Sequence, residues 1–159
     1  STCGIVPKMR MLADENLQIT LALSLHAPTQ EKRSMLMPIA GTYALEEVLE
    51  ACRYYFYKTG RRVTFEYSLS SGVNDSDEEA KQLIRLLRSI DAKCHVNLIP
   101  VNPVRERDFR QPNRQSVLQF QKKLLESGIN ATIRREMGQD IDGACGQLRR
   151  KYAAGTGEP

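Results

Sequence analysis

The sequence predicts an α/β fold in which parallel strands alternate with helices. Apolar residues at every second position, which are typical of strands, occur at residues 19–26, 63–69, 94–99 and 131–135. Between these runs lie longer segments whose apolar residues recur every three or four positions, as on one face of a helix. Strands joined by helices in this way lie parallel in one sheet.

Capping residues mark two of the predicted helices. The apolar stripe from Leu45 to Phe56 is followed by Gly60, and glycine is favoured just past a helix C-terminus. A later stripe begins after Asn113, a good N-cap residue, and ends before Gly128.

Two further helices are expected from their first turns. Ser76 and Glu79 have the spacing of a capping box, in which each side chain accepts a hydrogen bond from the other residue's main chain. A weaker helix is expected at residues 6–15, with Pro7 in its first turn, where its missing N–H does no harm.

The strands place apolar side chains on one face and polar side chains on the other. If helices cover the apolar face, the polar face lines the inside of a curved, barrel-like sheet and suits a polar ligand. Four strands cannot close a barrel, so further strands are expected upstream of Ser1. The expected inner face comprises Ser24, His26, Thr64, Glu66, Ser68, His95, Asn97 and Arg134. On this inner face the Glu66 carboxylate needs a partner if it is buried, and either Arg134 or a ligand could provide one.

Binding groups on such folds gather where strands end, at their carboxyl ends. This rule selects residues 24–26, 66–74 and 100–103, and the glycine-rich loop that holds Cys145. Cys145 lies between Ala144 and Gly146, so its thiol is open to close approach. It is either a reactive nucleophile or a buried structural cysteine.

Composition limits the function classes. The 159 residues are 41% hydrophobic and carry a net charge of +4, which permits a nucleic-acid partner without implying one. No apolar run is long enough to cross a membrane. The four cysteines have no C-x-x-C spacing, so no metal site is expected within the chain. They suit a reducing, cytoplasmic location.

Six motifs together resemble one enzyme family. They are S-T-x-G at 1–4, S-L-H-A-P at 24–28, R-V-T-x-E-Y at 62–67, G-V-N-D at 72–75, N-L-I-P-x-N-P at 97–103 and D-I-D-x-A-C-G-Q-L at 140–148. The chain resembles the radical S-adenosylmethionine methyltransferases that modify position 2 of adenine in 23S ribosomal RNA and in transfer RNA. A close relative of that family methylates position 8 instead.

The resemblance implies the C-terminal half of an open (β/α)6 partial barrel over residues 1–151, with a flexible tail at 152–159. It implies S-adenosylmethionine and a 4Fe-4S cluster as cofactors and ribosomal and transfer RNA as partners. The C-x-x-x-C-x-x-C loop that binds the cluster is absent from the sequence. The missing N-terminal half is therefore expected as a partner, and the isolated chain is expected to be inactive and to expose apolar surface along its open edge.

The resemblance also implies roles for individual residues. Ser1, Ser24, Leu25, His26 and Asn102 contact S-adenosylmethionine, and Cys145 carries the methyl group before it reaches adenine. A radical formed from a second cofactor molecule then activates the S-methyl group.

Alternatives remain open on the residues alone. His26 could be a hydrogen-bonded structural histidine, and Asn102, between two prolines, could set a turn. Residues 105–114 hold four arginines around Phe109, which suits either an RNA contact or a solvated loop. A non-catalytic α/β module that binds RNA or a partner is the alternative to an enzyme.

Overall fold

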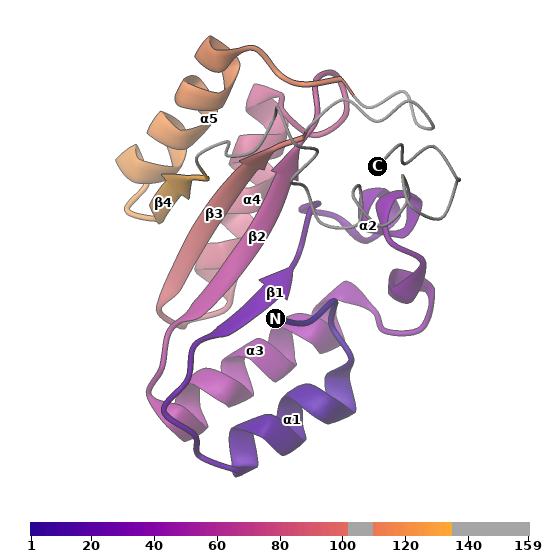
Figure 1. Ribbon diagram of the computed structural model, residues 1–159, viewed down its shortest axis with the longest axis vertical. Coiled ribbons are helices and arrows are strands. Elements are labelled where there is room, and N and C mark those ends of the chain that lie inside the picture. The colour runs from indigo at the N-terminus through magenta and orange to yellow at the C-terminus, as the bar shows by residue number, and fades with distance from the viewer. Residues whose placement is uncertain (102–109, 135–159) are drawn as a thin grey trace, which may run out of the picture.

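The computed structural model describes residues 1–101 and 110–134, and its elements alternate as expected (Figure 1). In chain order they are α1 (Val6–Asp14), β1 (Leu21–Ser24), α2 (Gln30–Leu36), the 3-10 helix η1 (Pro38–Gly41), α3 (Leu45–Thr59), β2 (Val63–Leu69), α4 (Asp77–Ser89), β3 (Cys94–Pro100), α5 (Arg114–Glu126) and β4 (Asn130–Ile133).

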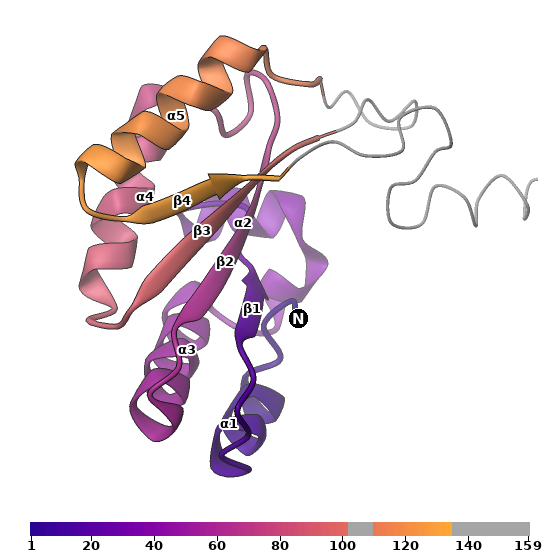
Figure 2. The same cartoon turned by 60° about the vertical axis from the view of Figure 1, so that its left-hand side comes forward.

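The four strands form one parallel sheet in the order β1-β2-β3-β4. Helices α3, α4 and α5 lie on one side of this sheet (Figure 2). The described part of the chain therefore has the parallel strands and flanking helices that the sequence predicts.

The core lies between the sheet and these helices. Along β2, every second side chain from Val63 to Leu69 is buried, and the residues between them are partly exposed. The ring of Tyr67 lies 5.6 Å from that of Phe120 on α5, which joins the centre of the sheet to its helical layer. The strand alternation expected from the sequence is thus confirmed for β2.

The first strand is shorter than residues 19–26. It begins at Leu21, and Ile19 is 44% exposed, so the expectation that Ile19 shares the buried face is wrong. The strand ends at Ser24, because His26 has a φ of +60°, a left-handed conformation that cannot continue a strand. The last strand, β4, covers residues 130–133 rather than 131–135.

Most helix boundaries follow the predicted caps. Pro7 lies in the first turn of α1, and the side chain of Asn113 accepts a hydrogen bond from the Ser116 N–H at 2.8 Å. Gly60 and Gly128 have φ values of +65° and +80°, as glycine caps require.

The capping box at α4 is only half formed. The Ser76 hydroxyl accepts a hydrogen bond from the Glu79 N–H at 3.2 Å, but the Glu79 carboxylate forms an ion pair with Lys32 on α2. The predicted return bond is therefore replaced by a tertiary contact.

Helix α2 and η1 are not predicted by the sequence. The side chain of Gln30 holds them together, because its Nε2 donates to the Ala40 carbonyl at 2.9 Å and its Oε1 accepts from the Leu45 N–H at 2.7 Å. The bond to Leu45 also fixes the start of α3.

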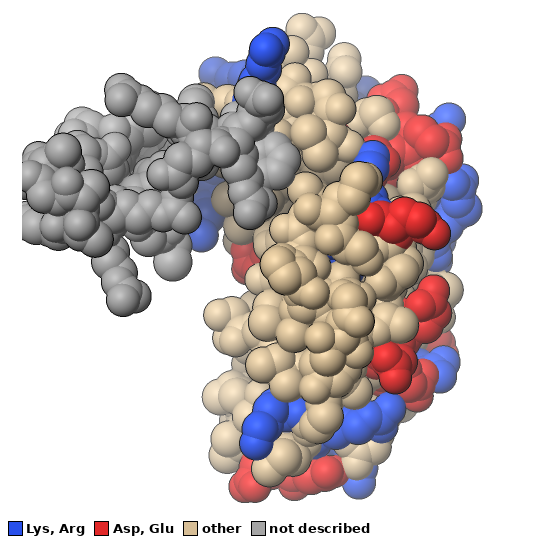
Figure 3. Space-filling view, turned by 90° about the vertical axis from the view of Figure 1, so that its right-hand side faces the viewer, with Lys and Arg blue, Asp and Glu red and all other residues tan. Residues whose placement is uncertain are grey.

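Within residues 1–101 and 110–134, no helix is long and apolar enough to span a membrane. Several large apolar side chains are exposed along the first part of the chain, among them Ile5, Met11, Leu17 and Ile19. Figure 3 shows a broad face on which uncharged atoms predominate. The predicted tail, residues 152–159, lies outside the described residues.

Candidate functional site at the carboxyl ends of the strands

The N-terminal segment lies against the outer edge of β1. The Thr2 N–H donates to the Ala22 carbonyl at 2.8 Å, and the Ser24 N–H donates to the Thr2 carbonyl at 2.9 Å. Thr2 and Leu23 thus form a parallel bridge, which places Ser1 next to the strand that carries Ser24. The structure brings these two predicted cofactor contacts to the same edge of the sheet.

A row of polar residues crosses the sheet face that lies opposite the core. The register aligns Ser24, Glu66, Asn97 and Thr132 on four successive strands. The Asn97 amide donates to the Glu66 carboxylate at 3.0 Å, and His95 Nε2 lies 3.0 Å from the Thr132 hydroxyl. Among the described residues, the partner of the Glu66 carboxylate is Asn97 rather than Arg134. This face can offer hydrogen bonds to a polar ligand.

A cavity of about 200 Å³ lies where β1, β2 and β3 end. Its walls combine apolar and polar side chains: His26, Leu36, Ser68, Ser70, Val73, Asn74 and Val101. Pockets that enclose a whole small molecule are usually larger, at about 300 Å³ or more. The cavity is therefore large enough for only a part of such a molecule, and its walls offer both apolar surface and hydrogen-bonding groups.

The His26 ring is held in one orientation at this cavity. Its Nδ1 accepts a hydrogen bond from the Ser68 N–H at 3.1 Å, so in the neutral ring the proton is on Nε2. Nε2 has no hydrogen-bond partner among the described residues. The main-chain N–H groups of Leu25 and His26 both donate to the Glu66 carbonyl, at 3.0 and 3.3 Å.

The His26 ring is neutral at physiological pH. Burial, together with the positive charge of Arg33, lowers its pKa from 6.5 to about 4. The neutral ring of His26 can therefore offer Nε2–H as a hydrogen-bond donor at this site.

Leu25 differs from its neighbours in sequence, Ser24 and His26. The whole residue is buried, with 0% of its surface exposed, so in this conformation neither the side chain nor the main chain of Leu25 is open to a cofactor. The other two predicted site residues, Asn102 and Cys145, lie outside the described residues. Val101, the last described residue before Asn102, lines the cavity, and its N–H donates to the Leu69 carbonyl at 3.0 Å.

Arg33 is a fully buried arginine beneath the N-terminal segment. Its Nη2 donates to the Cys3 carbonyl at 2.8 Å, while Nε and Nη1 have no partner among the described residues. Burial lowers the pKa of the guanidinium. The group holds the turn at residues 1–4 against α2.

The described cysteines do not form a metal or cluster site. Residues 1–101 and 110–134 contain no group of three or more potential metal ligands. Burial raises the pKa of the Cys52 thiol to about 12 and that of Cys94 to about 11, so both are poor nucleophiles. The described residues therefore do not fit a 4Fe-4S cluster.

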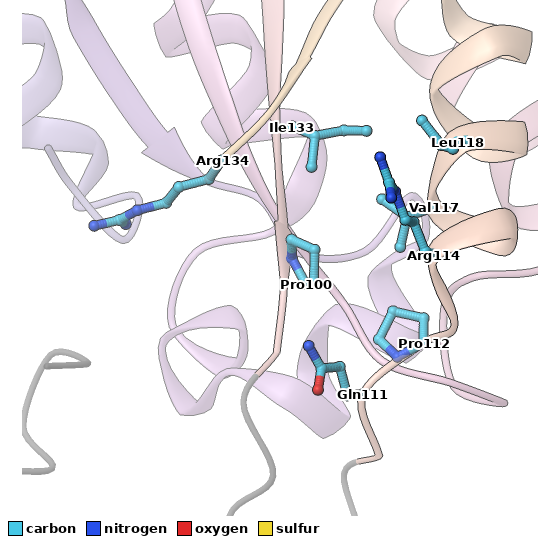
Figure 4. A pocket seen from close by; sticks show the side chains of 8 residues that line it. All are labelled: Pro100, Gln111, Pro112, Arg114, Val117, Leu118, Ile133 and Arg134. Carbon is cyan, nitrogen blue, oxygen red and sulfur yellow. The ribbon is translucent and has the colours of Figure 1, made fainter. Parts of the chain in front are cut away.

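A second cleft, of about 450 Å³, lies between the ends of β3 and β4 and the start of α5. Figure 4 shows Arg114 extending between Ile133 and Leu118, whereas Arg134 points away from the other lining residues. A guanidinium beside apolar surface suits a nucleotide, because it can contact a phosphate while the apolar wall contacts a base. A larger groove, of about 740 Å³, lies at the amino ends of the strands, at the end opposite the site expected for this fold.

Comparison with known proteins shows close relatives over almost the whole chain. A protein of Lachnospira eligens named as a probable dual-specificity RNA methyltransferase RlmN is 62% identical over 152 residues, which are 96% of this chain and 43% of that protein. A Clostridioides difficile protein of the same name is 58% identical over 152 residues, again 96% of this chain and 44% of that protein. The crystal structure of a radical SAM methyltransferase from Sphaerobacter thermophilus matches with 50% identity and a TM-score of 0.88, over 93% of this chain and 43% of that one.

The chain is homologous to part of the RlmN RNA methyltransferases. It spans less than half the length of the curated RlmN relatives that it matches. A domain of a pyruvate-formate lyase-activating enzyme from Bacteroides vulgatus shares the fold at 19% identity and a TM-score of 0.60, over 73% of this chain and 67% of that one. No family model matches the sequence.

The relatives named RlmN bear out the predicted resemblance. The two solved structures bear out the predicted fold, parallel strands with flanking helices as in a partial barrel. Because the RlmN relatives are named as enzymes, the alternative of a non-catalytic binding module is not favoured. Ser68, Ser70 and Asn74 line the cavity beside His26 and lie within the predicted stretch 66–74, but the sequence assigned none of them an individual role toward the cofactor. Their position at the carboxyl end of β2 or just after it was the available signal.

Proposed function

We propose that the chain forms the cofactor-binding part of a longer RNA methyltransferase that methylates position 2 of adenine in ribosomal and transfer RNA. The observation that carries this proposal is the 62% identity over 152 residues to a protein named as a dual-specificity RNA methyltransferase. The structural match to a radical SAM methyltransferase supports the same class of chemistry. The missing part of the barrel and the cluster-binding loop would come from the rest of that protein.

In this proposal the cavity beside His26 binds part of S-adenosylmethionine. His26 lines this cavity, and Asn102 follows Val101 at its wall. Ser1 and Ser24 lie together at the outer edge of β1, outside the residues that line the cavity, and would contact another part of the cofactor. Leu25, the remaining residue of the proposed site, lies between Ser24 and His26 in sequence. When bound, S-adenosylmethionine would supply the methyl group, and any radical chemistry would depend on a 4Fe-4S cluster held by residues outside this chain.

The role proposed for Cys145 is to accept the methyl group. Its thiolate attacks the methyl carbon, a new sulfur–carbon bond forms, and the sulfonium–methyl bond breaks to release S-adenosylhomocysteine. A carrier held next to the base makes the later transfer effectively intramolecular. The adenine must leave its stack to reach such a carrier.

The cleft that contains Arg114 is the proposed RNA contact on this part of the enzyme. Arg114 is exposed and lies on the same end of the sheet as His26. Substitution by glutamine should weaken RNA binding and reduce its salt dependence, because a phosphate contact releases a counterion. The cytoplasmic location expected from the cysteines stays a prediction.

The experiment that tests this function is peptide mass spectrometry of the full-length protein purified from cells. A methyl group on the Cys145 peptide, together with loss of adenine methylation in Cys145→Ala, would support the proposal. Cys94→Ala is the matched control and should retain methylation, since the Cys94 thiol is half-buried and has a raised pKa. An active enzyme whose Cys145 can be replaced without loss of methylation would exclude the proposed carrier.

The cofactor part is tested separately by calorimetric titration of the full-length protein with S-adenosylmethionine. His26→Ala should weaken binding, whereas Gln82→Ala on the outer surface of α4 should not. Equal affinity in wild type and His26→Ala would remove His26 from the cofactor site.

A further inference from the structure

The turn after β2 contains a buried asparagine that touches the main chain of His26. Asn74 is 1% exposed, and its Nδ2 donates to the His26 carbonyl at 2.8 Å and to the Ser68 carbonyl at 2.7 Å. Its Oδ1 accepts from the Ser70 N–H at 2.8 Å. Both protons of the Asn74 amide and one of its acceptor sites are thereby used in bonds that join the end of β2 to His26, the second residue after β1.

The same two segments also meet at the His26 ring. The Ser68 N–H donates to Nδ1, while the Ser68 carbonyl accepts from Asn74. The Asn74 amide therefore holds both the main chain of His26 and the peptide segment that contacts its ring. His26 has a φ of +60°, which costs a non-glycine residue free energy unless its surroundings fix it.

We propose that Asn74 is a positioning residue that keeps His26 in this conformation, with Nδ1 as acceptor and Nε2–H turned toward the ligand. The inference deepens the proposed function and rests on it for the identity of the ligand. It follows that the ligand atom facing Nε2–H is a hydrogen-bond acceptor. In S-adenosylmethionine such an atom is a ring nitrogen, a hydroxyl oxygen or a carboxylate oxygen.

Only an amide of this length supplies the required set of bonds. Aspartate has the same shape and can accept from the Ser70 N–H, but as a carboxylate it has no proton for the carbonyls of His26 and Ser68. Alanine and serine are too short to reach both carbonyls. Asn74→Asp therefore removes the two donated bonds while leaving the volume of the side chain unchanged.

The neighbouring residue provides a matched control. Asp75 Oδ1 accepts from the Gly72 N–H at 2.8 Å within the same turn, a bond that does not involve His26. Asp75→Asn keeps an acceptor for Gly72 and makes the reverse chemical change one position along the chain. It should leave the His26 ring and cofactor binding unaltered.

The test uses the full-length protein labelled with nitrogen-15 on histidine, with His26→Gln to assign the signals. In the wild type at pH 8, nuclear magnetic resonance should show Nδ1 unprotonated and Nε2 protonated. In Asn74→Asp this single tautomer should be lost, and calorimetry should show binding of S-adenosylmethionine weakened by about tenfold or more. Asp75→Asn should match the wild type in both measurements.

Each other outcome is decisive. A wild-type ring protonated on Nδ1 would overturn the inference without any variant, so it is testable even if Asn74→Asp does not fold. Unchanged His26 ring signals in Asn74→Asp would also overturn it. If the tautomer is lost but affinity is unchanged, the positioning role stands and the proposed contact between His26 and S-adenosylmethionine fails.

Discussion

The ammonium group of Lys32 on α2 contacts the carboxylate of Glu79 on α4. The Lys32 Nζ also donates to the Val73 carbonyl at 2.7 Å, so one side chain joins α2, the turn after β2 and the first residues of α4. Glu79 is only 7% exposed, and its Oε2 has no partner among the described residues. Lys32 therefore neutralises a nearly buried carboxylate close to the turn that contains Asn74.

Lys32→Met should lower the free energy of unfolding by about 2–3 kcal/mol, because it leaves the Glu79 carboxylate without a counter-charge. The double variant Lys32→Met/Glu79→Leu should lose less than the single variant, since no buried charge remains. Urea unfolding of both variants measures this difference.

The matched control is the exposed pair of Lys122 and Glu126 on α5. Lys122→Met should cost less than about 0.5 kcal/mol, because solvent screens an exposed pair. A Lys32→Met variant as stable as Lys122→Met would contradict the role given to the Lys32–Glu79 pair.

The titration of His26 should lower the free energy of unfolding in mild acid. Its pKa is about 4 in the folded protein against an ordinary value of 6.5, so between these values the unfolded chain binds a proton that the folded chain does not. The contribution of His26 to stability is therefore fully present above pH 6.5 and falls as the pH decreases toward 4, with a loss of up to about 3 kcal/mol over that window. Thermal or urea unfolding between pH 4 and 7.5 measures the decline.

His26→Gln should flatten this decline, since glutamine does not titrate. The second histidine, His95, has a pKa that burial also lowers, so His95→Gln should remove a part of the slope as well. The same pH dependence in His26→Gln as in wild type would show that His26 does not titrate as expected.

Gly4 should not tolerate a side chain. Its φ is +105°, and a methyl group there would lie 3.0 Å from Nη2 of the buried Arg33 and 3.2 Å from Val48. Gly4→Ala should destabilise the protein by about 1–3 kcal/mol from backbone strain, with any steric cost added. Gly41→Ala, where no atom lies within 4 Å of the new methyl group, is the control and should be nearly neutral. Equal melting temperatures for the two variants would refute the close packing at Gly4.

Cys52 should resist alkylation in the folded protein. Its side chain is fully buried, and burial raises its pKa to about 12, so very little thiolate exists at pH 8. Treatment with iodoacetamide followed by peptide mass spectrometry should show label on Cys52 only after the protein is unfolded in urea. Rapid labelling without denaturant would mean that α3 opens readily or that the thiol is not buried.

Periodicity and caps were sufficient to predict the sheet and four of its helices, because apolar alternation and capping chemistry are local. They did not predict α2, whose most buried residue is Arg33, since a buried arginine appears in sequence as a solvent-exposed position. The predicted capping box of α4 is only half formed for a related reason. Lys32 is 47 residues away from Glu79 and could not be recognised as its partner.

The candidate site was predicted in outline. The rule that ligands gather at the carboxyl ends of parallel strands selected His26 and the stretch after β2, where the cavity lies. The left-handed conformation of His26, the tautomer of its ring and the contribution of Asn74 depend on contacts between residues 42 to 48 positions apart. Such contacts are set by tertiary packing, which the local sequence does not reveal.

The spatial order of the strands is the same as their order in the chain, with every neighbour parallel. Each strand therefore docks on an edge that the preceding segment has already formed, and none has to be inserted between two others. During synthesis the sheet can be extended from one side as the polypeptide leaves the ribosome. Co-translational folding of this chain can thus proceed step by step, with each new strand added to the free edge of the strand before it.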